Sequence, residues 1–243
     1  MLNEITLFSL TTITSAIAGI CGLGGGMILA LTLPIFLAPA AIIPIHGVTQ
    51  LASNSSRLIF AFKDVHWPFV PQFVLGGIIG TALFSIFLVN LPNDYIPLFI
   101  STYLLLSLWL KAFSHVMNKI ENFYVVGCIQ AGLGLLVGAP GPLTITFLMK
   151  RLEDKNQIIA TASVLMALTN LNKIIVYGFL GFHFSEYLDI MAITIIGATL
   201  GSFIGTKLRN KIPNKPFMRS LKWLITLMAL YTLTNALISL GMI

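Results

Sequence analysis

The sequence of 243 residues is 57% hydrophobic and only 9% charged. In a soluble domain roughly a quarter of all residues are charged. The composition of this chain cannot supply the polar surface that a soluble fold needs. It therefore excludes a soluble globular protein and predicts an all-α, polytopic membrane protein. The formal net charge of +6 is explained by membrane topology and contact with lipid headgroups, so we expect membrane lipids and no nucleic acid as partners.

Apolar runs and their interruptions predict eight helical segments in chain order. They cover residues 4–38, 41–62, 69–90, 95–113, 122–151, 157–180, 187–206 and 217–242, each boundary being approximate. The first segment is long for a single crossing, and each half of the first or fifth segment is short for one. Glycine and proline interrupt these two segments, at Gly24-Gly25-Gly26 in the first and between Gly138 and Pro142 in the fifth.

The two halves of the chain resemble each other at an offset of 116 residues. This offset pairs Gly22 with Gly138, Gly25 with Gly141, Asn54 with Asn170, and Arg57 with Lys173. Internal duplication is a common design of transporters. We therefore predict two membrane repeats, residues 1–121 and 122–243, that together form one compact transmembrane domain.

The basic residues of the loops discriminate between two topologies. With eight full crossings the basic loops would fall on both faces of the membrane, which contradicts the positive-inside rule. If the first and fifth segments are instead re-entrant hairpins, every basic loop falls on one face, and Asp94, Glu186 and Asp189 lie on the other. The charges favour inverted repeats whose hairpins enter from opposite faces and meet near the midplane. Eight crossings with kinked helices remain the alternative.

The two interruptions are candidate anion-binding elements. In hydrocarbon, unpaired backbone groups are tolerated only where they are buried in protein or line an aqueous cavity. Half-helices that begin near Met27 and Leu143 would direct free N–H groups and their positive dipole ends into such a cavity. Three consecutive glycines exceed what helix packing requires, whereas we interpret the separate glycines Gly76, Gly80, Gly197 and Gly201 as close-packing positions.

The second segment carries a polar stripe. Its polar residues recur at helical spacing and share one helical face, which must point to protein or water; they are His46, Thr49, Gln50, Ser53, Asn54 and Arg57. The sixth segment has a weaker counterpart that includes Asn170 and Lys173.

Each polar type in these stripes has an anion-binding interpretation and a structural alternative. The amides of Asn54 and Asn170 are expected to donate hydrogens to anion oxygens. Arg57 and Lys173 are expected to supply charge at the two mouths of the site, unless they extend to the lipid headgroups instead. His46 is a possible proton carrier, or a histidine with a purely structural role.

The candidate substrate-binding residues come from both interruptions and both stripes. They are Gly24, Gly25, Gly26, His46, Thr49, Gln50, Asn54, Arg57, Gly138, Pro140, Gly141, Asn170 and Lys173. All eight carboxylates lie at segment ends or in loops, which argues against cation transport. The sequence has no HExxH motif, no paired intramembrane aspartates and no Walker loop, so we expect neither an enzyme, nor a metal site, nor a cofactor.

The pattern resembles the sulfite exporter TauE/SafE family. The residues that carry the resemblance are the run from Gly22 to Gly26 with Pro34, the stretch from His46 to Trp67, the second Gly/Pro interruption, Asn170, Lys173 and Tyr177-Gly178. The resemblance implies a multi-pass permease of the bacterial inner membrane for sulfur-containing anions, such as sulfite or sulfonates like sulfoacetate. The second interruption reads Gly-Ala-Pro-Gly-Pro where the family more often has a glycine run, so the two halves need not contribute equally.

The expected function is secondary transport of a small anion by alternating access around a midplane site. A proton or sodium ion is the possible coupling ion. A passive anion channel and a non-transporting membrane subunit are the alternatives. The substrate, the direction of transport and the oligomeric state are left open by the sequence.

Overall fold

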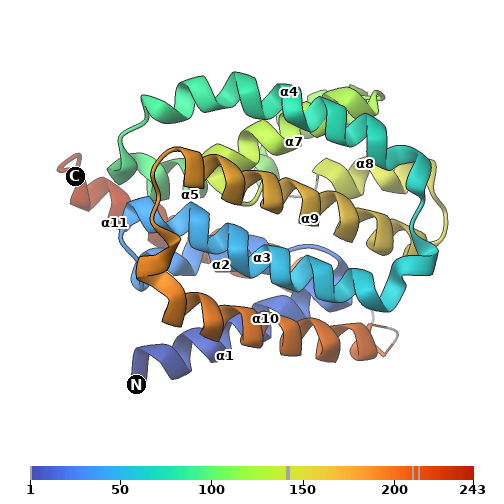
Figure 1. Ribbon diagram of the computed structural model, residues 1–243, viewed down its shortest axis with the longest axis horizontal. Helices are drawn as coiled ribbons and strands as arrows, with labels where there is room; N and C mark the ends of the chain where they lie inside the picture. Colours follow the sequence, from blue (N-terminus) through green and yellow to red (C-terminus); the bar gives the residue numbers. More distant parts are fainter. Residues whose placement is uncertain (1, 141–142, 210, 213) are drawn as a thin grey trace.

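A computed structural model describes residues 2–140, 143–209, 211–212 and 214–243 (Figure 1). Within these ranges the regular structure is helical throughout, without a strand. The α-helices are α1 (Leu2–Cys21), α2 (Gly25–Thr32), α3 (Pro39–Ala61), α4 (Val70–Val89), α5 (Ile96–Trp109), α6 (Lys111–Lys119), α7 (Phe123–Val137), α8 (Leu143–Arg151), α9 (Lys155–Phe179), α10 (Leu188–Leu208) and α11 (Asn214–Ser239). Short 3-10 turns, η1 (Leu33–Ile35) to η5 (Phe184–Tyr187), join several of them.

Several helices have the length and composition of membrane spans, which confirms an all-α polytopic membrane protein. In the described part of the chain, five stretches qualify: Asn3–Cys21, Trp67–Val89, Lys155–Phe179, Phe184–Leu208 and Pro216–Ser239. One expectation is wrong, because α1 alone is long enough for a crossing although it is only half of the first segment. At about 1.5 Å per residue its 19 span residues measure close to the roughly 30 Å of the hydrocarbon layer. The other arm, α2, is short, with 8 residues.

The chain turns back at both interruptions. Gly25 at the start of α2 lies directly against the backbone of Thr14 and the methyl group of Ala18 in α1, so α2 folds back along α1. In the second half, α8 likewise returns towards the end of the molecule from which α7 starts (Figure 1). The two hairpins open towards opposite ends, which is the re-entrant arrangement and not a pair of kinked crossings.

The first helix of each half packs on the fourth helix of the other half. Gly201 and Gly205 of α10 lie against the carbonyls of Thr12 and Ala16 of α1, so these two helices run parallel. The same relation joins α4 and α7, where Gly80 lies against the carbonyl of Cys128.

Glycine makes these contacts possible, because a Cβ at any of the four positions singled out in the sequence would overlap with the neighbouring helix. The positions are Gly76, Gly80, Gly197 and Gly201. Small residues at helix interfaces allow such close backbone approach. The close-packing interpretation of these four glycines is thereby confirmed.

The central helices of the two halves run antiparallel. In α3 and α9, His46 contacts Lys173, whereas Arg57 contacts Ser163. In α5 and α11, Trp109 donates a hydrogen bond to Thr226, whereas Pro97 lines a cavity together with Tyr231 and Asn235. Helices in equivalent positions therefore point in opposite directions, and we propose on this basis that residues 1–121 and 122–243 are inverted repeats.

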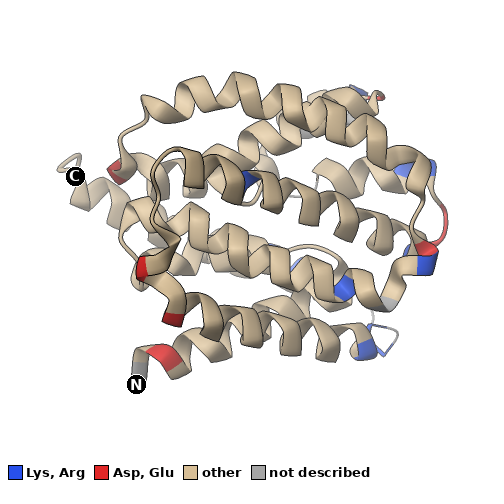
Figure 2. Cartoon of the chain, viewed as in Figure 1, with Lys and Arg blue, Asp and Glu red and all other residues tan. Residues whose placement is uncertain are grey.

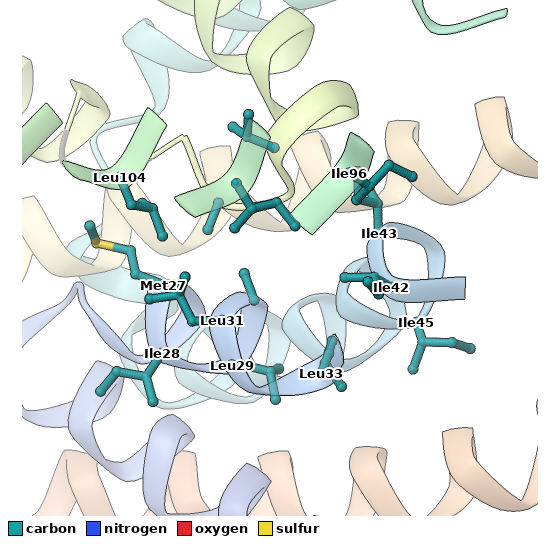
Figure 3. Close-up of a cluster of buried hydrophobic side chains, with 14 of the residues drawn as sticks. Met27, Ile28, Leu29, Leu31, Leu33, Ile42, Ile43, Ile45, Ile96 and Leu104 are labelled. Carbon is teal, nitrogen blue, oxygen red and sulfur yellow. The ribbon is translucent and has the colours of Figure 1, made fainter. Parts of the chain in front are cut away.

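The short helix α2 lies inside the protein. Seven of its eight residues are buried, and its apolar side chains belong to the largest core cluster. Figure 3 shows Met27 and Leu31 of α2 in one cluster with Ile42 of α3 and Leu104 of α5. Because protein surrounds α2, the interrupted backbone beside it is not exposed to lipid, as an interruption at membrane depth requires.

The two ends of the helix bundle differ in charge. Basic residues gather at the end where α3 stops and α9 starts, whereas the charged residues that the structure describes at the opposite end are acidic (Figure 2). Lys63 lies in the turn after α3, and Asp94 and Glu186 lie in turns at the other end. Such a separation of charge is expected if the first and fifth segments are re-entrant hairpins, because every basic loop then falls on one face of the membrane.

Candidate functional site

Glycines with positive φ form both interruptions. In the first, Gly22 has a φ of 79° and Gly24 a φ of 94°; in the second, Gly138 has a φ of 71°. Residues with a Cβ rarely adopt such angles. Gly22 and Gly138, which the offset of 116 residues pairs, therefore share the same unusual backbone conformation at the point where the chain reverses.

The start of α2 is open. Its N-cap residue is Gly24, which offers no side chain to accept a hydrogen bond. The first N–H groups of a helix have no partner within the helix itself, so those of α2 remain available to a ligand. In the second half α8 starts at Leu143, but Gly141 lies outside the described residues and its predicted role cannot be placed.

A cavity of about 60 Å³ lies where the two interruptions meet α3 and α9. At ~10–15 Å³ of such volume per water molecule, it accommodates a few water-sized groups. Its lining residues are Ala18, Gly22, Leu23, Gly24, Gly26, Met27, His46, Gln50, Asn54, Arg57, Gln130, Gly138, Ala139, Pro140, Met166, Thr169 and Asn170. They contribute no acidic side chain within the described chain.

The structure brings most of the predicted residues to this cavity. The predicted residues in its wall are Gly24, Gly26, His46, Gln50, Asn54, Arg57, Gly138, Pro140 and Asn170. Lys173 lies directly behind the wall, where it hydrogen-bonds to Gly138 and Asn170.

Two predicted residues point elsewhere. Gly25 faces α1, where a Cβ would overlap with the carbonyl of Thr14, so its role is to close the hairpin. The Thr49 hydroxyl is fully buried and donates 2.9 Å to the carbonyl of Ile45 in its own helix. Neither residue is placed in the cavity wall.

Arg57 lies inside the protein with an exposed fraction of 3%. Its Nη1 donates 3.0 Å to Ser53 Oγ, its Nη2 donates to Asn54 Oδ1, and its Nε lies 3.5 Å from Ser163 Oγ. The first two partners belong to the same turns of α3, so the helix itself holds the guanidinium at the cavity. Extension of this side chain to the headgroups is excluded.

Lys173 repeats this arrangement in the second half. Its side chain is 1% exposed, and Nζ donates 2.9 Å to Asn170 Oδ1 and 2.8 Å to the carbonyl of Gly138. As in the Asn54–Arg57 pair, the cation is bound by the amide oxygen three residues earlier in its helix. Headgroup contact is again excluded, and the charge lies beside the cavity instead of at a mouth.

The two asparagines therefore differ in part from what the sequence suggests. Their amide oxygens accept hydrogen bonds from the cations. One amide hydrogen of each is used within the helix, from Asn54 to the carbonyl of Gln50 at 2.7 Å and from Asn170 to that of Met166 at 2.8 Å. Their main effect is to orient Arg57 and Lys173, and only the second amide hydrogen remains for a ligand.

His46 connects the two interruptions. Its Nε2 lies 2.9 Å from the carbonyl oxygen of Gly26, and its Nδ1 lies 3.5 Å from Lys173 Nζ. A carbonyl only accepts hydrogen bonds, so Nε2 carries the proton and Nδ1 turns its lone pair towards the ammonium group. The imidazole thus joins the first interruption to the lysine that binds the second.

The electrostatics of the site are those of an incomplete ion pair. Among the described residues, the groups that accept hydrogen bonds from Arg57 and Lys173 are all neutral. A buried charge is costly unless an opposite charge or strong hydrogen bonds compensate it. Two cations therefore lie beside one cavity whose described wall residues include no carboxylate.

Gln130 is the most deeply buried polar residue among the lining residues that were not predicted. Gln130 of α7 is 1% exposed and lies in the cavity wall. Its signal in the sequence is a lone amide in an otherwise apolar stretch, since polar side chains inside membrane helices turn towards protein or water. At the offset of 116 residues its counterpart is Thr14 of α1, which does not line the cavity, so the repeat pattern did not point to Gln130.

Comparisons with known proteins agree with this geometry. The family model described as sulfite exporter TauE/SafE matches residues 7–232, which is most of the chain and includes every cavity residue. Neither the curated proteins nor the solved structures yield a match. Members of the matched family are membrane transporters and not enzymes. The chain belongs to the sulfite exporter TauE/SafE family.

Proposed function

We propose that this protein is a secondary transporter for a small sulfur-containing anion, such as sulfite or a small sulfonate, and that the cavity between the interruptions is its binding site. The observation that carries the proposal is the burial of Arg57 and Lys173 beside one cavity with neutral partners only. An anion at this position is attracted by both charges and by the free N–H groups at the start of α2.

The hairpins supply a basis for alternating access. They open towards opposite ends of the bundle (Figure 1). Residues of both interruptions line the cavity. Movement of one hairpin opens the cavity to one side, while the other hairpin keeps it closed. The site itself remains on α3 and α9, the antiparallel pair at the centre.

Counterflow in proteoliposomes tests this function. Vesicles loaded with unlabelled sulfite should accumulate labelled sulfite transiently, with saturation. Arg57→Gln and Lys173→Gln should each reduce this exchange at least tenfold, because each removes a charge that the anion neutralises. Lys63→Gln is the matched control, since Lys63 is exposed in the turn after α3 and its loss should have no such effect.

The other function classes give different outcomes in the same experiment. Ohmic conductance without counterflow would identify a passive channel. Absence of both flux and anion binding would identify a non-transporting subunit. We further propose a location in the bacterial inner membrane and coupling to a proton or sodium gradient. If each gradient is collapsed separately, only the loss of the coupling gradient should stop uphill transport.

A further inference from the structure

The cavity wall contains one unpaired donor and one unpaired acceptor. Gln50 Nε2 and Gln130 Oε1 are both buried, and neither has a hydrogen-bond partner in the described part of the chain. Buried polar atoms normally have partners, and an unpaired one costs free energy. Two such atoms in one wall indicate that the missing partner is a ligand.

A neighbouring group fixes the orientation of the Gln130 amide. Gln130 Nε2 lies 3.5 Å from the sulfur of Met166, which acts only as a weak acceptor. Reversal of this amide would set its oxygen against the lone pairs of the sulfur. The oxygen of Gln130 is therefore the atom left without a partner, and it offers an acceptor to the cavity.

The second amide has the opposite polarity. The Gln50 side chain lies against Gly26 at the open start of α2, with its oxygen nearest to that glycine. Its Nε2 is left as a donor, as are the free N–H groups of α2. Together with Arg57 and Lys173, these groups suit the oxygen atoms of an anion.

The acceptor of Gln130 does not suit a fully deprotonated oxyanion. Every oxygen of such an ion is itself an acceptor, so contact with Gln130 Oε1 would bring lone pairs together and leave a buried acceptor unpaired. An anion that carries one O–H or N–H group satisfies both amides at once, as donor to Gln130 and acceptor from Gln50.

We propose that the site selects small oxyanions that carry a hydrogen-bond donor of their own, and that Gln130 is the residue that reads this donor. The inference rests on the proposed function and narrows its substrate class. A singly protonated oxyanion and a small sulfonate with a hydroxyl or ammonium group both belong to this class. A sulfonate that lacks any donor does not.

Hydrogen phosphate and sulfate form a matched pair of probes. At mildly alkaline pH both are tetrahedral dianions, and they differ by one O–H group. Calorimetry on the purified protein should give a dissociation constant for hydrogen phosphate about tenfold lower than for sulfate. This factor corresponds to the free-energy cost of leaving one buried acceptor without a hydrogen bond. Gln130→Leu should bring this ratio close to one, while Gln50→Leu should weaken both anions and leave the ratio as it was.

Gln157→Leu is the control, because Gln157 is exposed in the first turn of α9 and should leave both constants unchanged. If Gln130→Leu does not fold, the closer isostere Gln130→Met and the ratio for the unmodified protein carry the test. Equal binding of the two anions, or a ratio of dissociation constants that is unchanged in the Gln130 variants, would overturn this inference but not the proposed function. Failure of both probes to bind would overturn it too, and failure of sulfite and methanesulfonate as well would overturn the proposed function.

Discussion

The ammonium group of Lys173 lies 3.5 Å from Nδ1 of His46, and this contact joins the two hairpins. On one side His46 binds the carbonyl of Gly26, and on the other Lys173 binds that of Gly138. One backbone carbonyl from each interruption is thus connected by two side chains, from α3 and α9. His46 also lines the cavity, so the bridge lies directly beside the candidate binding site.

Replacement of Lys173 should separate binding from stability. In Lys173→Met the buried charge is lost while the aliphatic chain is kept, so the protein without ligand should be as stable as before, or more stable. Addition of sulfite should raise the midpoint of thermal unfolding of the unmodified protein but not that of the variant. A loss of stability without ligand would instead mean that Lys173 mainly holds the hairpins together.

Replacement of Gly26 should damage the site and preserve the fold. A Cβ at Gly26 would lie 3.0 Å from Gln50 Oε1, the far end of a flexible side chain. Gly26→Ala should therefore displace Gln50, weaken anion binding about tenfold and leave the unfolding temperature nearly unchanged. Gly178→Ala, where the nearest atom to a Cβ is 3.8 Å away, should be neutral in both measurements.

The neighbouring glycine should behave in the opposite way. A Cβ at Gly25 would overlap with the backbone of α1, so Gly25→Ala should force the hairpin apart and lower the stability before any question of binding arises. Thermal unfolding in detergent distinguishes the two variants. Equal stability of Gly25→Ala and Gly26→Ala would contradict the placement of these glycines.

Glycine packing between α4 and α7 should be position-specific. Gly80→Ala would place a Cβ on the carbonyl of Cys128, whereas Gly77→Ala would make an ordinary contact of 3.6 Å with Ala131. We expect the first to lower the free energy of unfolding by about 1–3 kcal/mol, the usual cost of overpacking, and the second to change it little. Denaturant titration in mixed micelles measures both, and similar losses would contradict the close approach of the two helices.

His46 should act through its hydrogen bond rather than through a change of charge. His46→Gln keeps a side-chain donor that reaches the carbonyl of Gly26, and we expect transport to persist, reduced less than tenfold. His46→Leu removes the donor and should abolish transport. Counterflow of labelled sulfite at several pH values checks both, and loss of pH dependence in an active His46→Gln protein would identify His46 as the proton carrier instead.

The sequence was sufficient for the interruptions and for the stripe of α3. Both depend on local rules: glycine and proline break helices wherever they cluster, and helical spacing puts His46, Gln50, Asn54 and Arg57 on one face. The side of the helix that meets a cavity follows directly from such a pattern. The general position of the site between two interruptions could therefore be predicted.

Other properties depend on tertiary packing and could not be predicted. Gly25 and Gly26 are adjacent, but one step along a helix turns the direction by about 100°, so one faces α1 and the other faces Gln50. Arg57 and Lys173 have stems long enough to reach either the headgroups or the interior, and only the neighbouring helices decide. The repeat partner of Gln130 is Thr14, which is not an amide and does not line the cavity, so the role of Gln130 emerges only when α7 is placed beside α3 and α9.

The parallel contacts of α1 with α10 and of α4 with α7 bear on which parts of the protein move. These glycine-lined interfaces join helices from different halves of the sequence. A rocking motion of residues 1–121 against 122–243 would have to separate the helices at both of these interfaces. We therefore expect α1 to move together with α10, and α7 together with α4, so that each moving unit would combine helices from both halves of the sequence.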